Sequence, residues 1–272
     1  MGEVTVGLLH PGEMGAAVGQ CLAAAGHRVL WVPEGRSPAT AARAEAAGLT
    51  PASAGLADLI READVIFSVC PPHAALEVAR EVAGFGLARR AAGFGGVYVD
   101  ANAISPATAG EVATVVKPAS FVDGGIIGTP PVTPGFIRLY LSGDRAPEVR
   151  ALFGGTAVDA RLVPPPGSAS AVKMAYASWT KGSAALLLAA RALARAEGVE
   201  PALLAEWGIS QPGLERRSAA ANGSAAAKGW RWVAEMEEIA ATMAAAGLPE
   251  GFHQAAAEIY GRFQQEPRRS DR

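Results

Sequence analysis

Short β-branched runs alternate with alanine-rich segments throughout the first half of the chain, and this alternation constrains the fold more than any other feature. The β-branched runs cover residues 4–9, 28–32, 64–69, 97–100 and 137–142. The alanine-rich segments between them, which have helical character, cover residues 14–25, 38–47, 73–84 and 106–113. Strands that alternate with helices form βαβ units, whose right-handed crossovers give a parallel sheet with helices on both faces. We therefore predict a doubly wound, mostly parallel α/β domain at the N-terminus.

The pattern changes near residue 160, where the segment RLVPPPGSAS combines three prolines with a glycine and two serines. Such a run interrupts regular structure. From about residue 169 to 197 the chain has the pattern of one long helix, roughly 40 Å in length. Shorter helical patterns follow at 201–207, 212–221, 228–246 and 251–265, and the charged tail EPRRSDR is expected to be disordered. The sequence therefore predicts two domains, residues 1–163 and an all-α domain of residues 164–272.

The composition argues against several classes of function. Half of the 272 residues are apolar, and the chain has 24 Lys and Arg residues against 26 Asp and Glu residues. Because there is no excess of basic residues, no nucleic-acid partner is expected. The two cysteines and the four scattered histidines form no metal-ligand spacing, so no metal is expected. The longest apolar helical stretch, 182–190, is too short for a bilayer, and a strand pattern that begins at Val4 leaves no room for a signal peptide. We expect a cytoplasmic protein without a membrane partner.

The first predicted strand runs into a glycine turn, VGLLHPGEMG, at residues 6–15. In a Rossmann unit the first glycine of G-x-G-x-x-G makes the turn tight, the second lets the backbone approach a diphosphate, and the third allows close helix packing. Gly12 and Gly15 occupy the second and third positions, and His10 replaces the first. The turn either closes on His10 under some strain or follows a variant path set by Pro11.

We therefore expect a Rossmann-type dinucleotide site in which five consecutive residues contact the cofactor, although an ordinary strand–helix turn with two glycines would give the same pattern. The five residues are His10, Pro11, Gly12, Glu13 and Met14.

The segment PEGRSPAT, after the second predicted strand, lies where the adenosine ribose of a dinucleotide is expected. Glu34 has the chemistry to accept a hydrogen bond from the ribose 2′-hydroxyl of NAD. Arg36, with the neighbouring hydroxyl of Ser37, suits the 2′-phosphate of NADP, because a guanidinium matches phosphate geometry. The segment favours NADP (NADPH) and leaves NAD possible; the alternative for Arg36 is a solvated loop charge.

Several segments together resemble the β-hydroxyacid dehydrogenase superfamily, which includes 6-phosphogluconate and 3-hydroxyisobutyrate dehydrogenases. LLHPGEMG is similar to the family's glycine turn, and DVIFSVCPP (64–72) to its fourth strand. VDANAISP (99–106) and FVDGGIIG (121–128) are similar to its next two segments, and GSASAVKMAYA (167–177) to the helix with its catalytic lysine. The resemblance covers nearly the whole chain. Within the superfamily, the chain is similar more specifically to a poorly characterised phosphogluconate-dehydrogenase-like branch.

The resemblance implies roles for residues that the turn alone does not reveal. It places Cys70, Pro71 and Pro72 in a loop beside the nicotinamide, and Lys173 at the position of the catalytic lysine. The chain departs from the family where Tyr176 and Ala177 replace two asparagines that follow the lysine. Two serines of the family are also replaced, by Asn102 in the segment VDANAISP and by Ile127 in the segment FVDGGIIG. The resemblance still implies the family's type of reaction. The departures put the family's usual substrate in question.

Lys173 is expected to be the general acid/base of a hydride transfer between nicotinamide and a small hydroxy acid or its carbonyl counterpart. A lysine between apolar neighbours more often extends its amine to water. A catalytic role for Lys173 is favoured because this residue aligns with the catalytic lysine of the family that the chain resembles. Tyr176 lies on the same helical face and is either a substrate contact or an aromatic core residue. Lys181 is turned roughly 80° away from Lys173 on the helix, so it either extends the site or is exposed, and exposure is favoured.

Other residues are candidates for binding the substrate, which we expect to carry a carboxylate. Asn102 follows a strand end and is expected to bond the nicotinamide ribose or the substrate. Gly124 and Gly125 either present backbone N–H groups to the carboxylate or form a tight turn between strands. Arg231, between two tryptophans, is a carboxylate clamp or a helix-packing residue.

Two further expectations follow for the C-terminal half. Trp230, Trp232 and His253 are candidates for the far wall of the substrate pocket. The long helix is apolar around much of its circumference, which predicts a homodimer formed through the helical domain. Two alternatives to the dehydrogenase stay open: a cofactor-binding sensor or scaffold that has lost catalysis, and an imine reductase.

Overall fold

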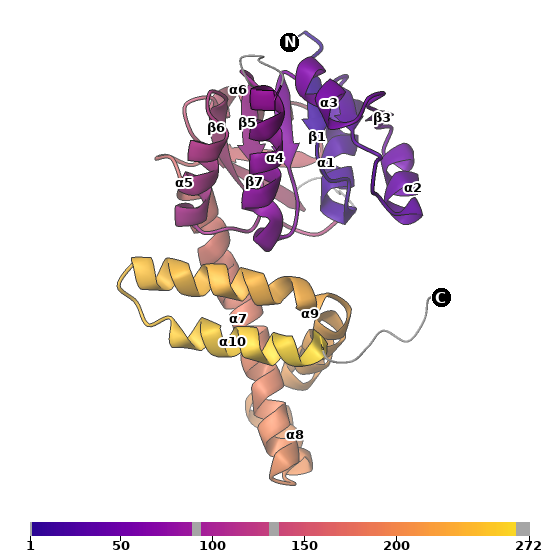
Figure 1. Ribbon diagram of the computed structural model, residues 1–272. Helices are drawn as coiled ribbons and strands as arrows, with labels where there is room; N and C mark the ends of the chain where they lie inside the picture. The colour runs from indigo at the N-terminus through magenta and orange to yellow at the C-terminus, as the bar shows by residue number, and fades with distance from the viewer. Residues whose placement is uncertain (1, 89–93, 131–135, 265–272) are drawn as a thin grey trace. The chain divides into compact units, whose positions relative to one another are not determined.

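The computed structural model of the protein describes residues 2–88, 94–130 and 136–264 (Figure 1). The chain forms two compact units, Met1–Lys173 and Met174–Arg272. The division falls within the long helix predicted from the sequence, and not at the proline run where we placed the domain boundary. The reason is that the first turns of this helix pack on the sheet of the first unit.

The first unit contains one eight-stranded sheet with the order β3-β2-β1-β4-β5-β6-β7-β8. Strands β1 to β6 are parallel, β7 is antiparallel to β6, and β8 is parallel to β7. The order of the six parallel strands is that of a Rossmann fold, which confirms the predicted fold class. The strands are β1 (Thr5–Leu8), β2 (Arg28–Trp31), β3 (Thr50–Pro51), β4 (Val65–Ser68), β5 (Val97–Asp100), β6 (Ser120–Ile127), β7 (Ile137–Ser142) and β8 (Val158–Leu162).

Six helices cover the two faces of this sheet. One buried apolar cluster joins the sheet to α1 (Glu13–Ala24), α2 (Pro38–Ala46) and α6 (Ala146–Ala151). A second joins its other face to α3 (Leu56–Glu62), α4 (Ala75–Ala88) and α5 (Pro106–Val115). Neighbouring strand residues alternate between the clusters, as Phe67 and Ile66 do, because side chains in a strand point to opposite faces.

Five elements of the first unit lie where the sequence pattern predicted none: β3, α3, β6, α6 and β8. Strand β6 was missed because it contains Gly124 and Gly125, and glycine is uncommon in strand interiors. The possibility that these two glycines form a tight turn is wrong. β3 has only two residues, and β8 lies at the sheet edge, where its polar residues weaken the strand pattern.

The second unit is helical, as predicted. It contains most of α7 (Ser168–Ala196), then α8 (Glu200–Ser210), α9 (Leu214–Ala245), α10 (Gly251–Gly261) and the short 3₁₀ helix η2 (Arg262–Gln264). Helix α9 is continuous where the sequence predicted two helices, at 212–221 and 228–246. A glycine in a helix costs only about 1 kcal/mol relative to alanine, so Gly223, which lies between the two predicted helices, does not end α9. The tail predicted to be disordered lies outside the described residues.

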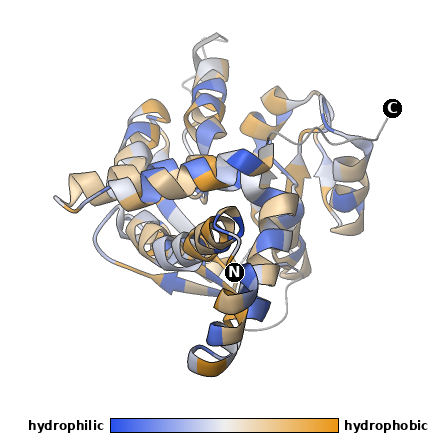
Figure 2. Ribbon diagram, turned by 90° about the horizontal axis from the view of Figure 1, so that it is seen from below, coloured by the Kyte–Doolittle hydropathy of each residue, from blue (hydrophilic) through white to orange (hydrophobic). Residues whose placement is uncertain are grey.

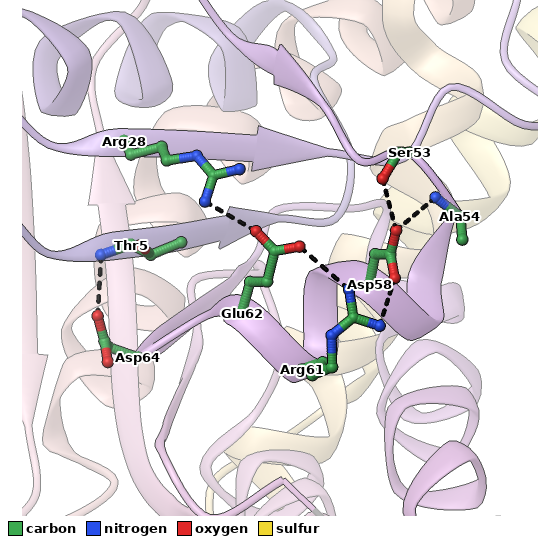
Figure 3. A network of polar contacts seen from close by, with 8 residues as sticks. All are labelled: Thr5, Arg28, Ser53, Ala54, Asp58, Arg61, Glu62 and Asp64. Carbon is green, nitrogen blue, oxygen red and sulfur yellow. Dashed lines mark hydrogen bonds and ion pairs between the residues drawn. The ribbon is translucent and has the colours of Figure 1, made fainter.

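A network of charged and polar side chains ties α3 to the strands beside it (Figure 3). Glu62 pairs with Arg28 of β2 at 2.7 Å and with Arg61 at 3.2 Å, and Arg61 also pairs with Asp58 at 2.6 Å. The Asp58 carboxylate accepts hydrogen bonds from the Ser53 hydroxyl and the Ala54 backbone N–H, and the Ser53 bond is the main cause that lowers its pKa. These contacts fix α3, whose apolar side faces β1.

A buried carboxylate on β6 holds the start of α7. Asp123 is 1% exposed and accepts hydrogen bonds from three donors: the Ser142 hydroxyl at 2.9 Å, the Ser170 hydroxyl at 2.5 Å and the Ser170 backbone N–H at 3.0 Å. The Ser170 N–H is one of the first amides of α7, which have no partner within the helix. A negative charge at a helix N-terminus is also favoured by the helix dipole. Asp123 therefore fixes the position of the first turn of α7 on the sheet.

We predict that Asp123→Ala lowers the free energy of unfolding by about 2–4 kcal/mol, because it leaves a buried amide and two hydroxyls without their acceptor. Urea unfolding followed by circular dichroism measures this loss. Asp144→Ala is the matched control, because Asp144 is exposed and should change stability by less than about 0.5 kcal/mol. Equal stability of the two variants would show that the contacts of Asp123 contribute little.

Candidate functional site

The candidate site lies at the carboxyl edge of the parallel strands. β1, β4, β5 and β6 are neighbours in the sheet. Strands β2 and β3 lie on one side of β1, and β4 and the later strands lie on its other side, so the strand order switches between β1 and β4. In open α/β sheets, ligands bind at the carboxyl ends of the strands next to such a switch point. The loops after β1, β4 and β5 therefore lie where a ligand is expected, and they contain many of the residues predicted from the sequence.

The glycine turn has the two properties expected of its second and third glycines. A Cβ at Gly15 would lie 2.1 Å from the carbonyl oxygen of His10, so only glycine fits where α1 crosses the turn. A Cβ at Gly12 would meet nothing within 4 Å, and Gly12 is the N-cap of α1 with φ −66°. The backbone at Gly12 is thus accessible at the positive end of a helix, where an anion binds favourably.

His10 and Arg36 lie together beside this turn. Arg36 Nη2 donates to the carbonyl oxygen of Leu9 at 3.4 Å. Burial, and then the charge of Arg36, lower the pKa of His10 to about 4, so the imidazole is neutral at pH 7. Nδ1 of His10 and Nε of Arg36 are buried and have no hydrogen-bond partner among the described residues. Buried polar atoms are normally paired, so these two are suited to a polar ligand.

The rest of the segment after β2 is arranged around α2 and α3. The Ser37 hydroxyl caps α2 by accepting the Thr40 N–H at 3.2 Å. The Glu34 carboxylate lies 3.4 Å from where a Cβ of Gly55 would be, at the N-terminus of α3. Of the predicted residues in this segment, Arg36 is the one that contacts the residues of the glycine turn.

The last two predicted residues of the turn begin α1. Glu13 is exposed in its first turn, and Met14 is partly buried against the apolar cluster. Arg43 of α2, which the sequence did not single out, donates to the carbonyl oxygen of Pro11 at 3.2 Å. No spacing in the alanine-rich segment marks this arginine as different from a solvated charge.

Asn102 joins the loops that follow β4 and β5. Its Oδ1 accepts the Cys70 N–H at 2.5 Å, and its Nδ2 donates to Ser68 Oγ at 3.1 Å and to Asp100 Oδ2 at 2.9 Å. The residue is 2% exposed. The expectation of a direct ligand contact stays a prediction; what the structure shows is a side chain that positions the Cys70–Pro71–Pro72 segment.

Cys70 itself is unsuited to nucleophilic chemistry. Burial, and then the charge of Asp100, raise the pKa of its thiol to about 12, so the thiolate is scarce at neutral pH. Pro71 is extended and Pro72 begins a short 3₁₀ turn that leads into α4. These residues therefore contribute backbone and apolar surface to the edge.

Lys173 lies against the extension of β6 beyond the end of β5. Asp100, the last residue of β5, pairs with Asp123, so Gly124 and Gly125 project past that strand. A Cβ at Gly125 would lie 2.5 Å from the carbonyl oxygen of Ala169 and 3.2 Å from the Cβ of Lys173. The absence of a side chain at Gly125 lets α7 approach the strand closely. Lys173, which is partly buried, is thereby held at the same edge as Asn102.

Gly124 fits the sheet for a similar reason, because a Cβ there would lie 2.9 Å from the carbonyl oxygen of Asp100. The two glycines are explained by packing, and their predicted contact with a carboxylate stays a prediction. The acid just before them, Asp123, was missed at the sequence level. An aspartate inside the apolar run FVDGGIIG was the available signal.

Five other predicted residues belong to the second unit. Tyr176 is 46% exposed on α7, and Arg231 lies 5.9 Å from the ring centroid of Trp230. Trp232 packs edge-on against Tyr260 at 5.0 Å. His253 is buried, with Nε2 3.4 Å from the Ser178 carbonyl oxygen. Trp232 and His253 thus pack the interior of the helical unit.

The sequence prediction for Lys181 is wrong. This lysine is not exposed: its amine forms an ion pair with Glu235 of α9 and lies 5.8 Å from the Trp232 ring centroid. The expectation of exposure came from the angle between Lys181 and Lys173 on the helix. It failed because a carboxylate on another helix faces the lysine.

Two properties of the described residues bear on the class of protein. No group of three or more His, Cys, Asp and Glu side chains in residues 2–88, 94–130 and 136–264 is arranged to hold a metal ion. Within the same ranges, no helix has the length and apolar character needed to cross a membrane.

Two family models match parts of the chain. Residues 5–91 match the family described as NADP oxidoreductase, coenzyme F420-dependent, and residues 194–263 match a domain of unknown function, DUF1932. An uncharacterized 28.5 kDa protein in the 7S RNA 5′ region of Methanothermus fervidus is 30% identical over 151 residues. That match spans 54% of each protein, so the chain matches about half the length of this curated relative.

Solved structures match nearly the whole chain. A conserved protein of unknown function, described as similar to 3-hydroxyacid dehydrogenases, is 28% identical with a TM-score of 0.65, over 96% of this chain and 97% of that one. The Mycobacterium tuberculosis 3-hydroxyisobutyrate dehydrogenase, solved with L-serine, is 21% identical with a TM-score of 0.68, over 97% and 95%. The reductive aminase from Aspergillus terreus, in complex with NADPH and ethyl levulinate, is 21% identical with a TM-score of 0.57, over 98% and 95%.

The last two likenesses show a shared fold. The family models and the first of these structures agree with the resemblance noted in the sequence. The chain is similar to the β-hydroxyacid dehydrogenase-like superfamily.

The two glycines of the turn give a matched pair of variants. We predict that Gly15→Ala lowers the free energy of unfolding by more than about 2 kcal/mol, because its methyl group would overlap the His10 carbonyl oxygen. Gly12→Ala should cost less than about 1 kcal/mol, the usual range for a change at a helix N-cap. Thermal and urea unfolding measure both. Similar losses for the two variants would contradict the different roles assigned to these glycines.

Proposed function

We propose that the protein is an NADP-dependent oxidoreductase that interconverts a small hydroxy acid and its carbonyl counterpart. One observation carries the proposal: the accessible backbone at Gly12 and the partly buried Lys173 lie along the same carboxyl edge. They are separated by the strands from β1 to β6, about 14 Å at the usual spacing between strands. This span suits an extended ligand that reaches from the turn to the lysine.

The residues of the turn fit a dinucleotide. The room above Gly12 and the N-terminus of α1 suit a diphosphate, and the unpaired buried nitrogens of His10 and Arg36 offer further polar contacts. Arg36 at the turn, with Glu34 directed toward α3, favours a 2′-phosphate and hence NADP over NAD. When bound, the nicotinamide ring donates or accepts the hydride. The family-model description and the NADPH complex of the reductive aminase support this choice of cofactor.

In this proposal Lys173 is the general acid/base that accepts and donates the proton. Its neutral amine accepts the proton of the substrate hydroxyl during oxidation, and its ammonium returns that proton to the carbonyl oxygen during reduction. Asp123 acts through α7, because it fixes the turn from which Lys173 projects. Asn102 acts through the Cys70 segment. Tyr176 and Arg231 are proposed to contact the substrate, with Arg231 on its carboxylate.

A second candidate function is reduction of a C=N bond. The likeness to a reductive aminase favours it, and a lysine is equally able to donate a proton to a developing amine nitrogen. NADPH oxidation with semialdehydes or keto acids, alone and together with an amine, separates the two activities. Tight NADPH binding without turnover on either set would favour a sensor.

We predict that Lys173→Met reduces turnover on the order of 10³-fold, which is typical for loss of a general acid/base, and leaves NADPH affinity nearly unchanged. Fluorescence titration with NADPH and steady-state kinetics measure the two effects separately. Lys228→Met is the matched control, because Lys228 is an exposed lysine on α9. Retention of most activity by Lys173→Met on a confirmed substrate would remove Lys173 from the mechanism.

We also propose that two chains associate through α7. Trp179, Leu186 and Leu193 are 69%, 56% and 64% exposed and follow one another at intervals of seven residues. In Figure 2 apolar and polar residues are interleaved along the helices. An apolar residue every seven positions forms a seam along one side of a helix, and an identical helix offers the matching seam.

We predict that the wild-type protein elutes at twice the mass of one chain and that Leu186→Glu elutes as a monomer, because a charge cannot be buried in an apolar seam without a partner. Size-exclusion chromatography with light scattering measures the mass. Leu248→Glu, at another exposed leucine that lies after α9, should leave the dimer intact. A wild-type monomer, or a Leu186→Glu dimer, would overturn the proposed interface.

A further inference from the structure

The helical unit contains a pocket that the proposed oxidoreductase function does not use. It lies where α7, α9 and the end of α10 meet and has a volume of about 340 Å³. Pockets for small molecules start at about this size. Its lining includes three arginines, Arg191, Arg195 and Arg262, next to an apolar surface formed by Leu188, Ile259 and Phe263.

The arginines carry more positive charge than the surrounding groups neutralise. Arg191 donates to Glu200 Oε1 through Nε at 2.8 Å and Nη2 at 2.5 Å, and through Nη1 to the Ser218 hydroxyl at 3.1 Å. Arg195 uses only its Nε for the same carboxylate, at 3.0 Å. Arg262 forms no ion pair with any residue in the described part of the chain. Glu200 thus balances one of three guanidinium groups.

The pocket walls supply both kinds of contact that an organic anion needs. A guanidinium binds a carboxylate through paired N–H donors. Arg195 and Arg262 keep donors that Glu200 does not occupy. Leu188 is 9% exposed, and two small residues, Ala192 and Ala226, also line the space and leave it open. Charge and apolar surface therefore lie within one enclosure.

We propose that this pocket binds a small organic anion: a carboxylate on a short hydrocarbon chain. Arg195 and Arg262 hold the carboxylate, and Leu188, Ile259 and Phe263 cover the chain. The lining of the pocket includes neither Lys173 nor the proposed substrate contacts Tyr176 and Arg231. The proposal goes beyond the oxidoreductase function and does not depend on it. It gives a binding role to the segment that matches the domain of unknown function.

Calorimetric titration of the full chain with hexanoate tests the proposal, with acetate and 1-hexanol as comparisons. Hexanoate should bind one site per chain. Acetate should bind more than about tenfold more weakly, because it lacks four methylenes that hexanoate buries against the apolar wall. Hexanol should also bind more than about tenfold more weakly, because it offers no charge to the arginines. Absence of saturable hexanoate binding, or equal binding of hexanol, would overturn the proposal.

Variants separate this site from the catalytic one, where a carboxylate is also expected. Arg262→Met should weaken hexanoate binding about tenfold or more, since a hydrogen bond to a charged group is lost. Arg195→Met should do the same, and unchanged thermal unfolding of either variant shows that the fold is intact. Arg216→Met, an exposed arginine outside the pocket, and Arg231→Met should bind as the wild type does. Binding lost in Arg231→Met and kept in Arg262→Met would assign hexanoate to the catalytic site and contradict the proposal.

Discussion

The buried contact between Asp123 and the first turn of α7 is the constraint on which the rest of the candidate site depends. One carboxylate on β6 accepts from the Ser170 N–H and from the hydroxyls of Ser142 and Ser170. Because these donors come from β7 and α7, the strand pair and the helix are fixed to each other. A helix is rigid over one turn, so the position of Lys173 follows from that of Ser170. Gly125 completes the arrangement by leaving room for the helix.

The other segments of the candidate site lie along the carboxyl edge of the sheet. The order of the parallel strands brings the Gly12 turn, the Cys70 segment and the β6 extension to the same edge of the sheet. Asn102 links two of these loops through a buried amide. Gly15 allows α1 to start close to β1, and Gly12 keeps the backbone accessible. Gly15 and Asn102 are explained by packing and internal hydrogen bonds, whereas the open backbone at Gly12 is the part suited to a ligand.

Much of this organisation could be predicted from the sequence because it rests on local patterns. Alternating strands and helices, the proline run before α7 and the context of Gly12 and Gly15 are all features of neighbouring residues. What failed depends on contacts between distant residues. The two glycines of β6 concealed a strand because their packing partner, α7, lies far along the chain. Lys181 was misjudged because Glu235, which faces it, is on another helix. The internal bonds of Asn102 likewise join residues of two different loops.

A crystal structure of the protein with NADP⁺ tests the central claim most directly, because it shows both ends of the proposed ligand at once. The account predicts that the diphosphate lies at the Gly12 backbone, that the 2′-phosphate contacts Arg36, and that the nicotinamide ring lies on the β6 side near Lys173. A dinucleotide bound away from this turn, or one whose adenine end faces Lys173, would contradict it.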